Sequence, residues 1–268
     1  MSKKWAVCMS GGGAKGAFQM GVLEALGERG IEIDFLSGSS VGALNAAGFA
    51  HVGIKQLKSV WLNIKGKKDI LKSSWLSWSP KGIYSTKPLK KIINKHVNKK
   101  SNIEAVACAV NLDGQIVYAS NQDHAPDVFA SWVEASCLIP FIMEPTIGHY
   151  FDGGIVEQTP LSYTLSRRDN VIVILNAPTK RFVYDKFEPY WPPIVSYGLR
   201  AIDDIMTREV FLNDVQANCE EWQNAGKKVH IIEPPEPLGI DTLDFEPKKL
   251  FFAYQKGREV GHAHRFTS

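Results

Sequence analysis

The chain has 268 residues, of which 44% are hydrophobic and 10% aromatic, and these values are ordinary for a globular protein with an apolar core. No run approaches the roughly 18 uninterrupted apolar residues that a membrane-spanning helix requires. Behind a basic start, the apolar stretch over residues 5–9 is too short for a signal peptide. We therefore expect a soluble protein that the general secretory route does not export.

Cysteine usage points to a reducing compartment. The chain has four cysteines without a CxxC pair, and each lies in or near an apolar segment: Cys8, Cys108, Cys137 and Cys219. Because a free cysteine behaves as a small hydrophobic side chain, we expect buried reduced thiols and a cytoplasmic protein.

The net charge of +3 hides an uneven distribution. Residues 55–100 hold thirteen lysines against the single acid Asp69, so this stretch alone carries +12 and the rest of the chain about −9. Such a block is compatible with a solvated helix face, with nucleic acid, or with anionic lipid head groups at roughly 1 kcal/mol for each nearby lysine. Nucleic acid is the partner that we do not expect.

The first fifty residues alternate between predicted strands and helices. Residues 5–9 form an apolar run that ends at a glycine-rich turn, and apolar residues recur at helical spacing over residues 15–29. A second strand is predicted over residues 31–37, a turn over residues 38–42, and a helix of small residues over residues 41–50. This order predicts a parallel α/β sheet.

The remaining chain continues this alternation. The predicted elements are a loop-like stretch over residues 67–87 that contains Trp75 and Trp78, a helix from Pro88, a hairpin of residues 105–110 and 116–119, a helix over residues 127–137, a buried strand over residues 171–175, a long helix over about residues 194–224, a strand over residues 228–232 and a final helix over residues 247–263. No linker interrupts the series, so we expect one domain over residues 1–268.

The helix from Pro88 is basic and amphipathic. One face is apolar and lysines surround it, with Leu89, Ile92, Ile93 and Val97 on the first and Lys90, Lys91, Lys95 and Lys99 around the rest.

The turn over residues 38–42 fits the G-x-S-x-G pattern with Ser40 at its centre. A serine on such a strand-to-helix turn projects above the sheet, and Gly38 and Gly42 lack the Cβ atoms that would clash. The amino end of the following helix adds its positive dipole end at the same point. The pattern predicts a nucleophilic serine.

The turn over residues 11–16 allows two interpretations. As G-x-G-x-x-G after a strand, it resembles a dinucleotide-binding turn, with Glu32 or Asp34 near the expected ribose-binding offset. As a run of glycines at a helix start, it offers backbone N–H groups that stabilise an oxyanion, at about 2.7–4 kcal/mol for each donor. A nearby nucleophile favours the second interpretation.

A nucleophilic serine needs a base. The late histidines His230, His262 and His264 come after Ser40 in the order of an α/β-hydrolase triad, but only two strands precede the serine, where that fold needs more. Asp152 is the better candidate, because Gly153 and Gly154 beside it permit close backbone approach. Its pKa must rise above the usual value of about 4 to make it an effective base.

Together these motifs resemble the patatin-like phospholipase family. The resemblance rests on Gly11-Gly12-Gly13-Ala14-Lys15-Gly16, on Gly38-Ser39-Ser40-Val41-Gly42, on Asp152-Gly153-Gly154, and on the segment over residues 135–140 with Phe141 and Pro145. It covers residues 5–175 and extends more weakly to the last helix. Lys15 stands where many members carry Arg, which removes a bidentate donor.

The resemblance implies a three-layer α/β sandwich around a mainly parallel central sheet. It further implies Ser40 as nucleophile, Asp152 as base without a catalytic histidine, and Gly11, Gly12 and Gly13 as the oxyanion hole. The implied activity is hydrolysis of acyl esters in phospholipids or other lipids through an acyl-enzyme, with neither a metal nor a cofactor.

Three alternatives remain open at this point. They are a nucleotide-binding oxidoreductase built on the first glycine turn, a lipid-binding protein without catalysis, and an acyltransferase or non-phospholipid esterase with the same dyad. A lipid substrate would also give the tryptophans and the basic helix a role, because both favour the head-group region of a membrane. We therefore expect peripheral contact with anionic membranes as well.

Overall fold

A computed structural model of the chain describes residues 4–73, 84–140, 143, 149–179, 222 and 224–266. The predicted long helix over about residues 194–224 lies almost entirely outside these residues, and so do Trp75, Trp78 and Cys219. The predicted loop-like stretch over residues 67–87 lies partly outside them, and the remaining predicted elements fall within them.

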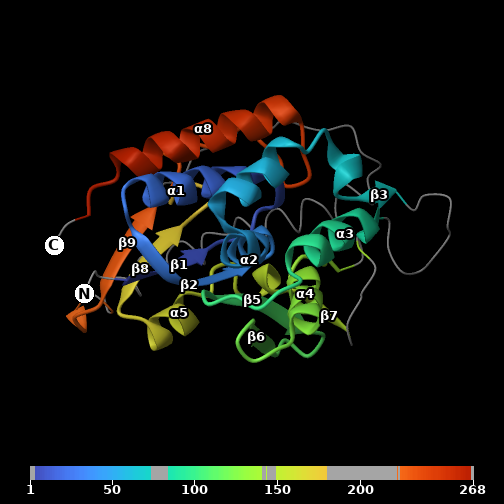
Figure 1. The fold of residues 1–268 in the computed structure, drawn as a ribbon, viewed down its shortest axis with the longest axis horizontal. Coiled ribbons are helices and arrows are strands. Elements are labelled where there is room, and N and C mark those ends of the chain that lie inside the picture. Colours follow the sequence, from blue (N-terminus) through green and yellow to red (C-terminus); the bar gives the residue numbers. More distant parts are fainter. Residues whose placement is uncertain are drawn as a thin grey trace.

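A seven-stranded sheet forms the centre of the described structure (Figure 1). Its strands are β1 (Lys4–Met9), β2 (Glu32–Ser39), β5 (Glu104–Asn111), β6 (Ile116–Ser120), β7 (Tyr150–Asp152), β8 (Asn170–Ile174) and β9 (Lys228–Ile232). The order is β6-β5-β2-β1-β8-β9, and β7 pairs with β5. The contacts of β1 with β2 and β8, of β2 with β5 and of β8 with β9 are parallel, whereas β6 and β7 pair antiparallel with β5. The prediction of a mainly parallel sheet is confirmed.

Helices cover both faces of this sheet. They are α1 (Gly16–Glu28), α2 (Val41–Leu62), α3 (Lys87–His96), α4 (Pro126–Ala135), α5 (Leu161–Arg167) and α8 (Pro247–Ala263). Short 3-10 turns are η1 (Gly13–Lys15), η2 (Lys67–Asp69) and η3 (Gly153–Ile155). A separate small hairpin consists of β3 (Lys72–Ser73) and β4 (Tyr84–Ser85). Figure 1 shows α1, α2 and α8 on one face and α5 on the other. The described residues thus form the expected three layers.

Side chains of the central strands alternate between two cores. Val7 of β1 and Ile172 of β8 belong to the larger core under α1, α2 and α8, whereas Cys8 and Val173 belong to the smaller core beside α5. This period of two is the pattern of a strand that is covered on both faces. Cys8, Cys108 and Cys137 are buried reduced thiols outside any disulfide, as predicted for these three.

Element boundaries differ from prediction at the two turns that matter most. β2 continues to Ser39 and α2 begins at Val41, so the predicted turn over residues 38–42 contracts to Ser40 alone. α2 extends to Leu62, beyond the predicted helix, and bends at Gly53, whose φ of 73° interrupts the helical dihedrals. Nonlocal packing of the second half of α2 explains the extension, because Trp61 is buried in the larger core.

Three parallel strands end at the same edge of the sheet. β1 runs into the first glycine turn, β2 runs into Ser40, and β8 ends at Ile174, whose carbonyl accepts the N–H of Ser10 at 3.1 Å. Because β1 lies between β2 and β8, the glycine turn and Ser40 leave adjacent strands in the same direction. The crevice at such a point is where open α/β sheets bind ligands.

Strand β7 brings Asp152 to this edge from the opposite direction. Along β5, residues Ala109 and Val110 pair with β6 on one side and with β7 on the other. β2 occupies that second side only as far as Cys108, which pairs with Ser39. β7 therefore continues where β2 stops, and Asp152, opposite Ala109, lies at the level where β2 ends.

Glycines allow α1 and α8 to pack backbone against backbone. A Cβ atom on Gly21 of α1 would lie 2.1 Å from the carbonyl oxygen of Tyr254, and one on Gly257 of α8 would lie 2.0 Å from that of Phe18. Gly27, in the same α1 helix, is exposed and has no atom within 4 Å of the equivalent position.

We expect Gly21→Ala to destabilise the protein and Gly27→Ala to leave it unchanged or slightly more stable. The first substitution forces the two helices apart, at about 1–3 kcal/mol for overpacking, whereas the second reduces the entropy of the unfolded chain, by up to about 1 kcal/mol. Chemical denaturation of both variants measures the difference. Equal stability of the two would contradict the close helix contact.

Candidate active site

Ser40 occupies a strained turn between β2 and α2. Its φ of 55° and ψ of −125° lie in a region that non-glycine residues rarely adopt. A Cβ on Gly38 would lie 2.3 Å from the carbonyl carbon of Gly42, and a Cβ on Gly42 would lie 2.4 Å from the carbonyl oxygen of Met9. Both glycines are therefore required by close backbone approach, and the sharp turn directs Ser40 to the sheet edge.

The segment after α4 holds this turn in place. The hydroxyl of Ser136 accepts the backbone N–H of Ser40 at 3.0 Å and donates to the carbonyl of Cys108 at 2.6 Å. The thiol of Cys137 donates to the carbonyl of Ser40 at 3.4 Å. These contacts stabilise the strained backbone of Ser40, and they come from the segment over residues 135–140 whose sequence carried part of the family resemblance.

Hydrogen bonds hold both the backbone and the side chain of Asp152. Its N–H donates to the carbonyl of Leu138 at 2.9 Å, and its Oδ1 accepts the N–H of Gly154 at 2.8 Å. A Cβ on Gly153 would lie 2.5 Å from the carbonyl oxygen of Cys108, so only glycine fits beside β5. The turn of Asp152 and the two glycines thus fixes the orientation of the carboxylate through Oδ1 and leaves Oδ2 available for a further hydrogen bond.

The structure brings the side chains of Ser40 and Asp152 together. Ser40 is 7% exposed and Asp152 is 1% exposed. Burial raises the pKa of Asp152 from an ordinary 3.8 to about 6, although the Ser40 hydroxyl and the Gly154 N–H, as hydrogen-bonding neighbours, lower it. Within the described residues, Oδ2 of Asp152 has no completed hydrogen bond, so the contact with Ser40 is looser than a formed bond, as is common before substrate binds.

The first glycine turn presents two unused N–H groups near Ser40. Gly11 donates its N–H to the carbonyl of Gln158 at 3.0 Å, and Ala14 donates to that of Thr242 at 2.9 Å. Gly12 and Gly13, with φ of 142° and 55°, donate to no acceptor among the described residues. The amide donors that this turn can offer an oxyanion are therefore those of Gly12 and Gly13, because that of Gly11 is occupied.

Two amide side chains turn the carbonyls of this loop away from the site. Nδ2 of Asn176 lies 3.3 Å from the carbonyl oxygen of Ser10 and 3.0 Å from that of Gly11, and Gln19 donates to Ser10 at 2.7 Å. The backbone N–H of Asn176 also donates to the hydroxyl of Ser10 at 3.0 Å. Asn176 and Gln19 were missed by the sequence analysis, because nothing in their local sequence marks them as partners of a distant glycine turn.

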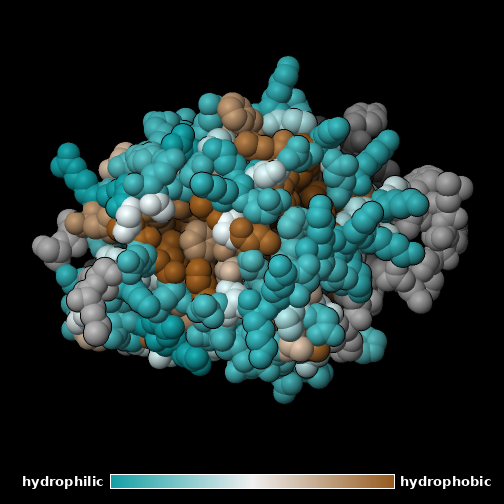
Figure 2. Space-filling model, in the orientation of Figure 1, coloured by the Kyte–Doolittle hydropathy of each residue, from teal (hydrophilic) through white to brown (hydrophobic). Residues whose placement is uncertain are grey.

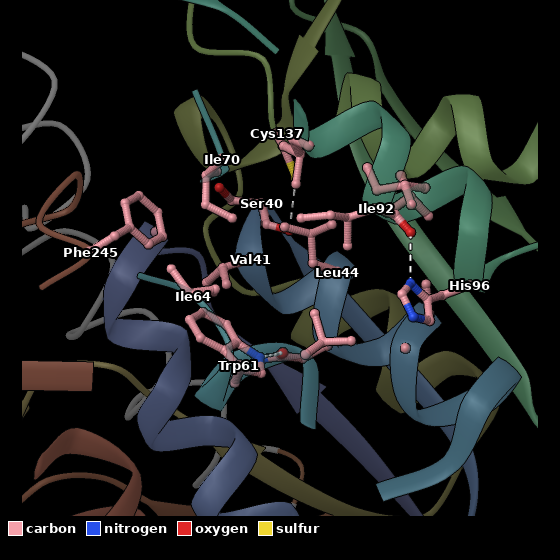
Figure 3. Close-up of a pocket in the computed structure, with 18 of the residues that line it drawn as sticks. Ser40, Val41, Leu44, Trp61, Ile64, Ile70, Ile92, His96, Cys137 and Phe245 are labelled. Atoms are coloured by element: carbon pink, nitrogen blue, oxygen red, sulfur yellow. Dashed lines mark hydrogen bonds between the residues drawn. The ribbon is translucent and has the colours of Figure 1, made fainter. Parts of the chain in front are cut away.

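A largely apolar cavity of about 120 Å³ opens beside Ser40. Figure 3 shows Leu44 and Ile92 on one side of Ser40 and Ile70 and Phe245 on the other. In Figure 2, hydrophobic surface is visible in a recess between α2 and the hydrophilic surface of α3. The cavity can therefore hold an apolar group next to the hydroxyl of Ser40.

Two further residues of the predicted motifs support the turns without facing the cavity. A Cβ on Gly16 would lie 2.2 Å from Cγ2 of Val41, so this glycine lets the first glycine turn approach the start of α2. Lys15 closes the 3-10 turn by donating its N–H to the carbonyl of Gly12 at 3.2 Å.

The late histidines lie elsewhere. His262 is 2.7 Å from Glu28 at the end of α1, and His230 packs against Trp5 at the start of β1 and against His264. Because α1 ends and β1 begins at the edge of the sheet opposite Ser40, these histidines are not positioned as its base.

Asp34, the ribose-binding candidate, lies 3.6 Å from Arg168 and five residues before β2 ends. Among the residues that the structure describes, no three or more His, Cys, Asp or Glu side chains are grouped to hold a metal ion. No helix within the described ranges is long and apolar enough to cross a bilayer.

The nucleophile turn, the buried carboxylate and the glycine turn fall within the part of the chain that a known family shares. A sequence model described as patatin-like phospholipase matches residues 7–165, from β1 to α5. The chain belongs to the patatin-like phospholipase family. The resemblance carried by the sequence motifs is thereby confirmed.

Several curated proteins are similar to this family member. Patatin-like phospholipase domain-containing protein 7 of Rattus norvegicus is 25% identical over 65% of this chain and 14% of its own length. Neuropathy target esterase sws of Drosophila melanogaster is 23% identical over 95% of this chain and 19% of its own length. Lysophospholipase nte1 of Aspergillus terreus is 52% identical over 43 residues, which are 16% of this chain and 3% of its own length. The chain spans less than a fifth of each of these relatives.

One solved structure supports the fold. The crystal structure of VipD from Legionella pneumophila aligns with a TM-score of 0.51 and 16% identity, over 96% of this chain and 66% of that chain. At this identity the match shows a shared fold.

We expect Asp152→Asn to raise stability at pH 8 and to leave it unchanged near pH 3. The folded pKa of about 6 lies above the ordinary 3.8, so the ionised carboxylate costs folding free energy above pH 6, about 3 kcal/mol, and the cost disappears as pH falls below 3.8. Asparagine removes the charge and still accepts the Gly154 N–H. Thermal unfolding of wild type and variant across this pH range measures the difference, and a variant that is less stable at pH 8 would contradict a desolvated carboxylate.

Proposed function

We propose that this chain hydrolyses acyl esters of lipids, as a phospholipase A or lysophospholipase does, with Ser40 as nucleophile and Asp152 as the base. The observation that carries the proposal is the buried carboxylate of Asp152 beside Ser40, at the edge where the first glycine turn ends β1. The relatives named as phospholipase, esterase and lysophospholipase support the same class of substrate.

The first half of the reaction forms an acyl-enzyme. Oγ of Ser40 attacks the ester carbonyl carbon while Asp152 accepts its proton, and the N–H groups of Gly12 and Gly13 stabilise the resulting oxyanion. Asp152 then gives the proton to the alkoxide oxygen as the carbon–oxygen bond of the ester breaks. The alcohol leaves, and the acyl group stays on Ser40.

The second half returns the enzyme to its starting state. Asp152 accepts a proton from water, and the hydroxide oxygen attacks the acyl carbon under the same two amides. The carbon–oxygen bond to Ser40 breaks, Ser40 regains the proton, and the fatty acid leaves. An acceptor alcohol in place of water would make the same machinery an acyltransferase, and nothing in the described residues favours such an acceptor over water.

The raised pKa of Asp152 suits this double role. A base with a pKa of about 6 is mostly ionised at pH 7 and is more basic than an ordinary carboxylate. Burial raises this pKa, so we infer that the desolvated carboxylate of Asp152 acts as the base that a histidine provides in a Ser-His-Asp triad.

We expect a fluorophosphonate probe to label wild type and to label neither Ser40→Ala nor Asp152→Asn. The labelling rate of wild type should fall as pH drops through about 6, because protonated Asp152 cannot accept the Ser40 proton. Mass spectrometry of the labelled protein locates the adduct, and labelling rates from pH 4 to pH 9 give the profile.

His230→Ala and His262→Ala serve as controls, since these side chains contact other elements. Abolished labelling in a folded His230→Ala or His262→Ala protein would replace the dyad by a triad.

We also propose that the face around α3 contacts anionic membranes, as a cytoplasmic protein with peripheral attachment would. Lys87, Lys91 and Lys95 recur every four residues and are exposed, so they form one basic stripe beside the helix face that lines the cavity. Lys90 has a different role, because its Nζ lies 3.1 Å from the buried carboxylate of Glu134. The stripe would bring the cavity to the lipid surface.

We expect Lys91→Glu/Lys95→Glu to weaken binding to phosphatidylserine vesicles by about tenfold or more, since each lysine contributes roughly 1 kcal/mol near such a surface. Lys228→Glu/Arg265→Glu is the matched control, because it makes the same charge change at exposed positions on the opposite edge of the sheet. Vesicle sedimentation measures both. Equal loss in the two double variants would reduce the stripe to a general charge effect.

The extent of the functional unit is part of the proposal. The strands of the central sheet, from β1 near the amino end of the chain to β9 near its carboxyl end, share one sheet, and the last helix packs on the first. We propose that residues 1–268 form a single acyl hydrolase domain.

A further inference from the structure

The cavity beside Ser40 has a definite direction along α2. At the Ser40 end, the N–H of Leu89 at the start of α3 donates to the carbonyl of Ile70 at 3.2 Å. At the other end, the hydroxyl of Ser101 just beyond α3 donates to the carbonyl of Ala50 at 2.6 Å. The helix α3 therefore runs beside the first half of α2 in the same direction, and the cavity lies between them.

The second half of α2 provides another wall. After the bend at Gly53, the chain turns back along the first half, so that Leu57 meets Gly48 and the indole N–H of Trp61 donates to Asn45 at 2.8 Å. Leu57 and Trp61 both line the cavity. One long apolar channel results, with Ser40 at one end and Gly48, Leu57 and Val97 toward the other.

The far end is less apolar than the middle. His96 lies there, half-buried, with Nδ1 donating to the carbonyl of Ile92 at 2.8 Å (Figure 3). It is an ionisable side chain on the wall of a channel whose other described walls are almost entirely apolar. The part of the channel suited to methylene groups therefore ends near His96.

Helix geometry gives the length of this channel. From Ser40 to Gly48 the chain advances eight residues, about 12 Å at about 1.5 Å per residue, and from Ser40 to Val52 it advances about 18 Å. An extended alkyl chain with carbon–carbon bonds of about 1.5 Å gains about 1.3 Å per carbon. The channel thus matches roughly 14 carbons to Val52 and roughly 9 carbons to Gly48.

We propose that this channel takes one extended acyl chain of the ester and that Gly48 determines the chain length accepted. The proposal rests on the proposed hydrolase function of Ser40. Gly48 and Leu57 lie against each other in the channel wall beyond its midpoint, where the absence of a side chain at position 48 gives room to the end of Leu57. Any longer side chain at position 48 shortens the channel to the part nearest Ser40.

The surroundings of Gly48 make this change feasible without unfolding the helix. A Cβ there would lie 2.7 Å from Cδ1 of Leu57, the far end of a flexible side chain, and the next nearest atom of Leu57 would be 3.6 Å away. Gly48 has no left-handed φ. A side chain at position 48 therefore displaces Leu57 or enters the channel, and both outcomes narrow it.

The test measures kcat/KM on p-nitrophenyl esters from 4 to 16 carbons, each below its micelle concentration. Wild type should favour about 12–14 carbons. Gly48→Leu should lower the value for 14 carbons by at least about tenfold and leave 4–8 carbons within about twofold, because methylene groups beyond the block lose their burial. Leu57→Ala should shift the preference toward longer chains. Combined with Gly48→Ala, it should return the profile toward wild type.

Gly27→Leu is the matched control, because Gly27 is an exposed helical glycine remote from the channel. Fluorophosphonate labelling shows whether Ser40 is intact in each variant, and Gly48→Ala replaces Gly48→Leu if the larger side chain prevents folding. A profile that keeps its wild-type shape in labelled Gly48 and Leu57 variants overturns the inference, and so does an equal fall at every chain length. Failure of wild type to be labelled or to hydrolyse any ester instead overturns the proposed function.

Discussion

The site depends on strand β7 meeting the end of β2 along the same side of β5. This pairing places Asp152 near Ser40 in a position that is almost completely shielded from solvent. Shielding from water raises the pKa of Asp152 toward neutrality, so that its carboxylate is a stronger base than an aspartate exposed to water. The same dehydration costs folding free energy, so the basicity that the proposed role of Asp152 requires and the stability of the protein are opposed at this residue.

Glycines serve three different purposes around this carboxylate. Glycine is required at positions 38, 42 and 153, because neighbouring backbone atoms occupy the space that a Cβ atom would fill. Gly12 and Gly13 adopt positive φ and keep their N–H groups available, while Asn176 holds the neighbouring carbonyls. Elsewhere, as at Gly21, glycine permits helix packing and has no part in chemistry. The glycine-rich motifs of this chain therefore combine steric necessity with the presentation of donors.

The helix α3 connects the interior of the site with its surroundings. Leu89 and Ile93 close the channel, Lys90 reaches the buried carboxylate of Glu134, and the exposed lysine stripe faces outward. The apolar side of this basic amphipathic helix therefore forms part of the channel wall. Its basic side gives the proposed lipid contact a location next to the channel, so that a chain leaving a membrane would travel a short path to Ser40.

Local sequence was enough to predict most of the elements and the candidate catalytic residues of this protein. Apolar periodicity fixed the strands β1, β8 and β9 and the last helix α8, and glycine spacing marked Ser40 and Asp152, because these signals act over a few residues. Tertiary structure alone decided that Gly11 gives its N–H to Gln158, that Ser136 holds Ser40, and that Asn176 orients the glycine turn. It also decided the direction of the channel. These contacts join residues far apart in the chain, and one sequence carries no record of which distant polar groups will meet once the sheet has formed.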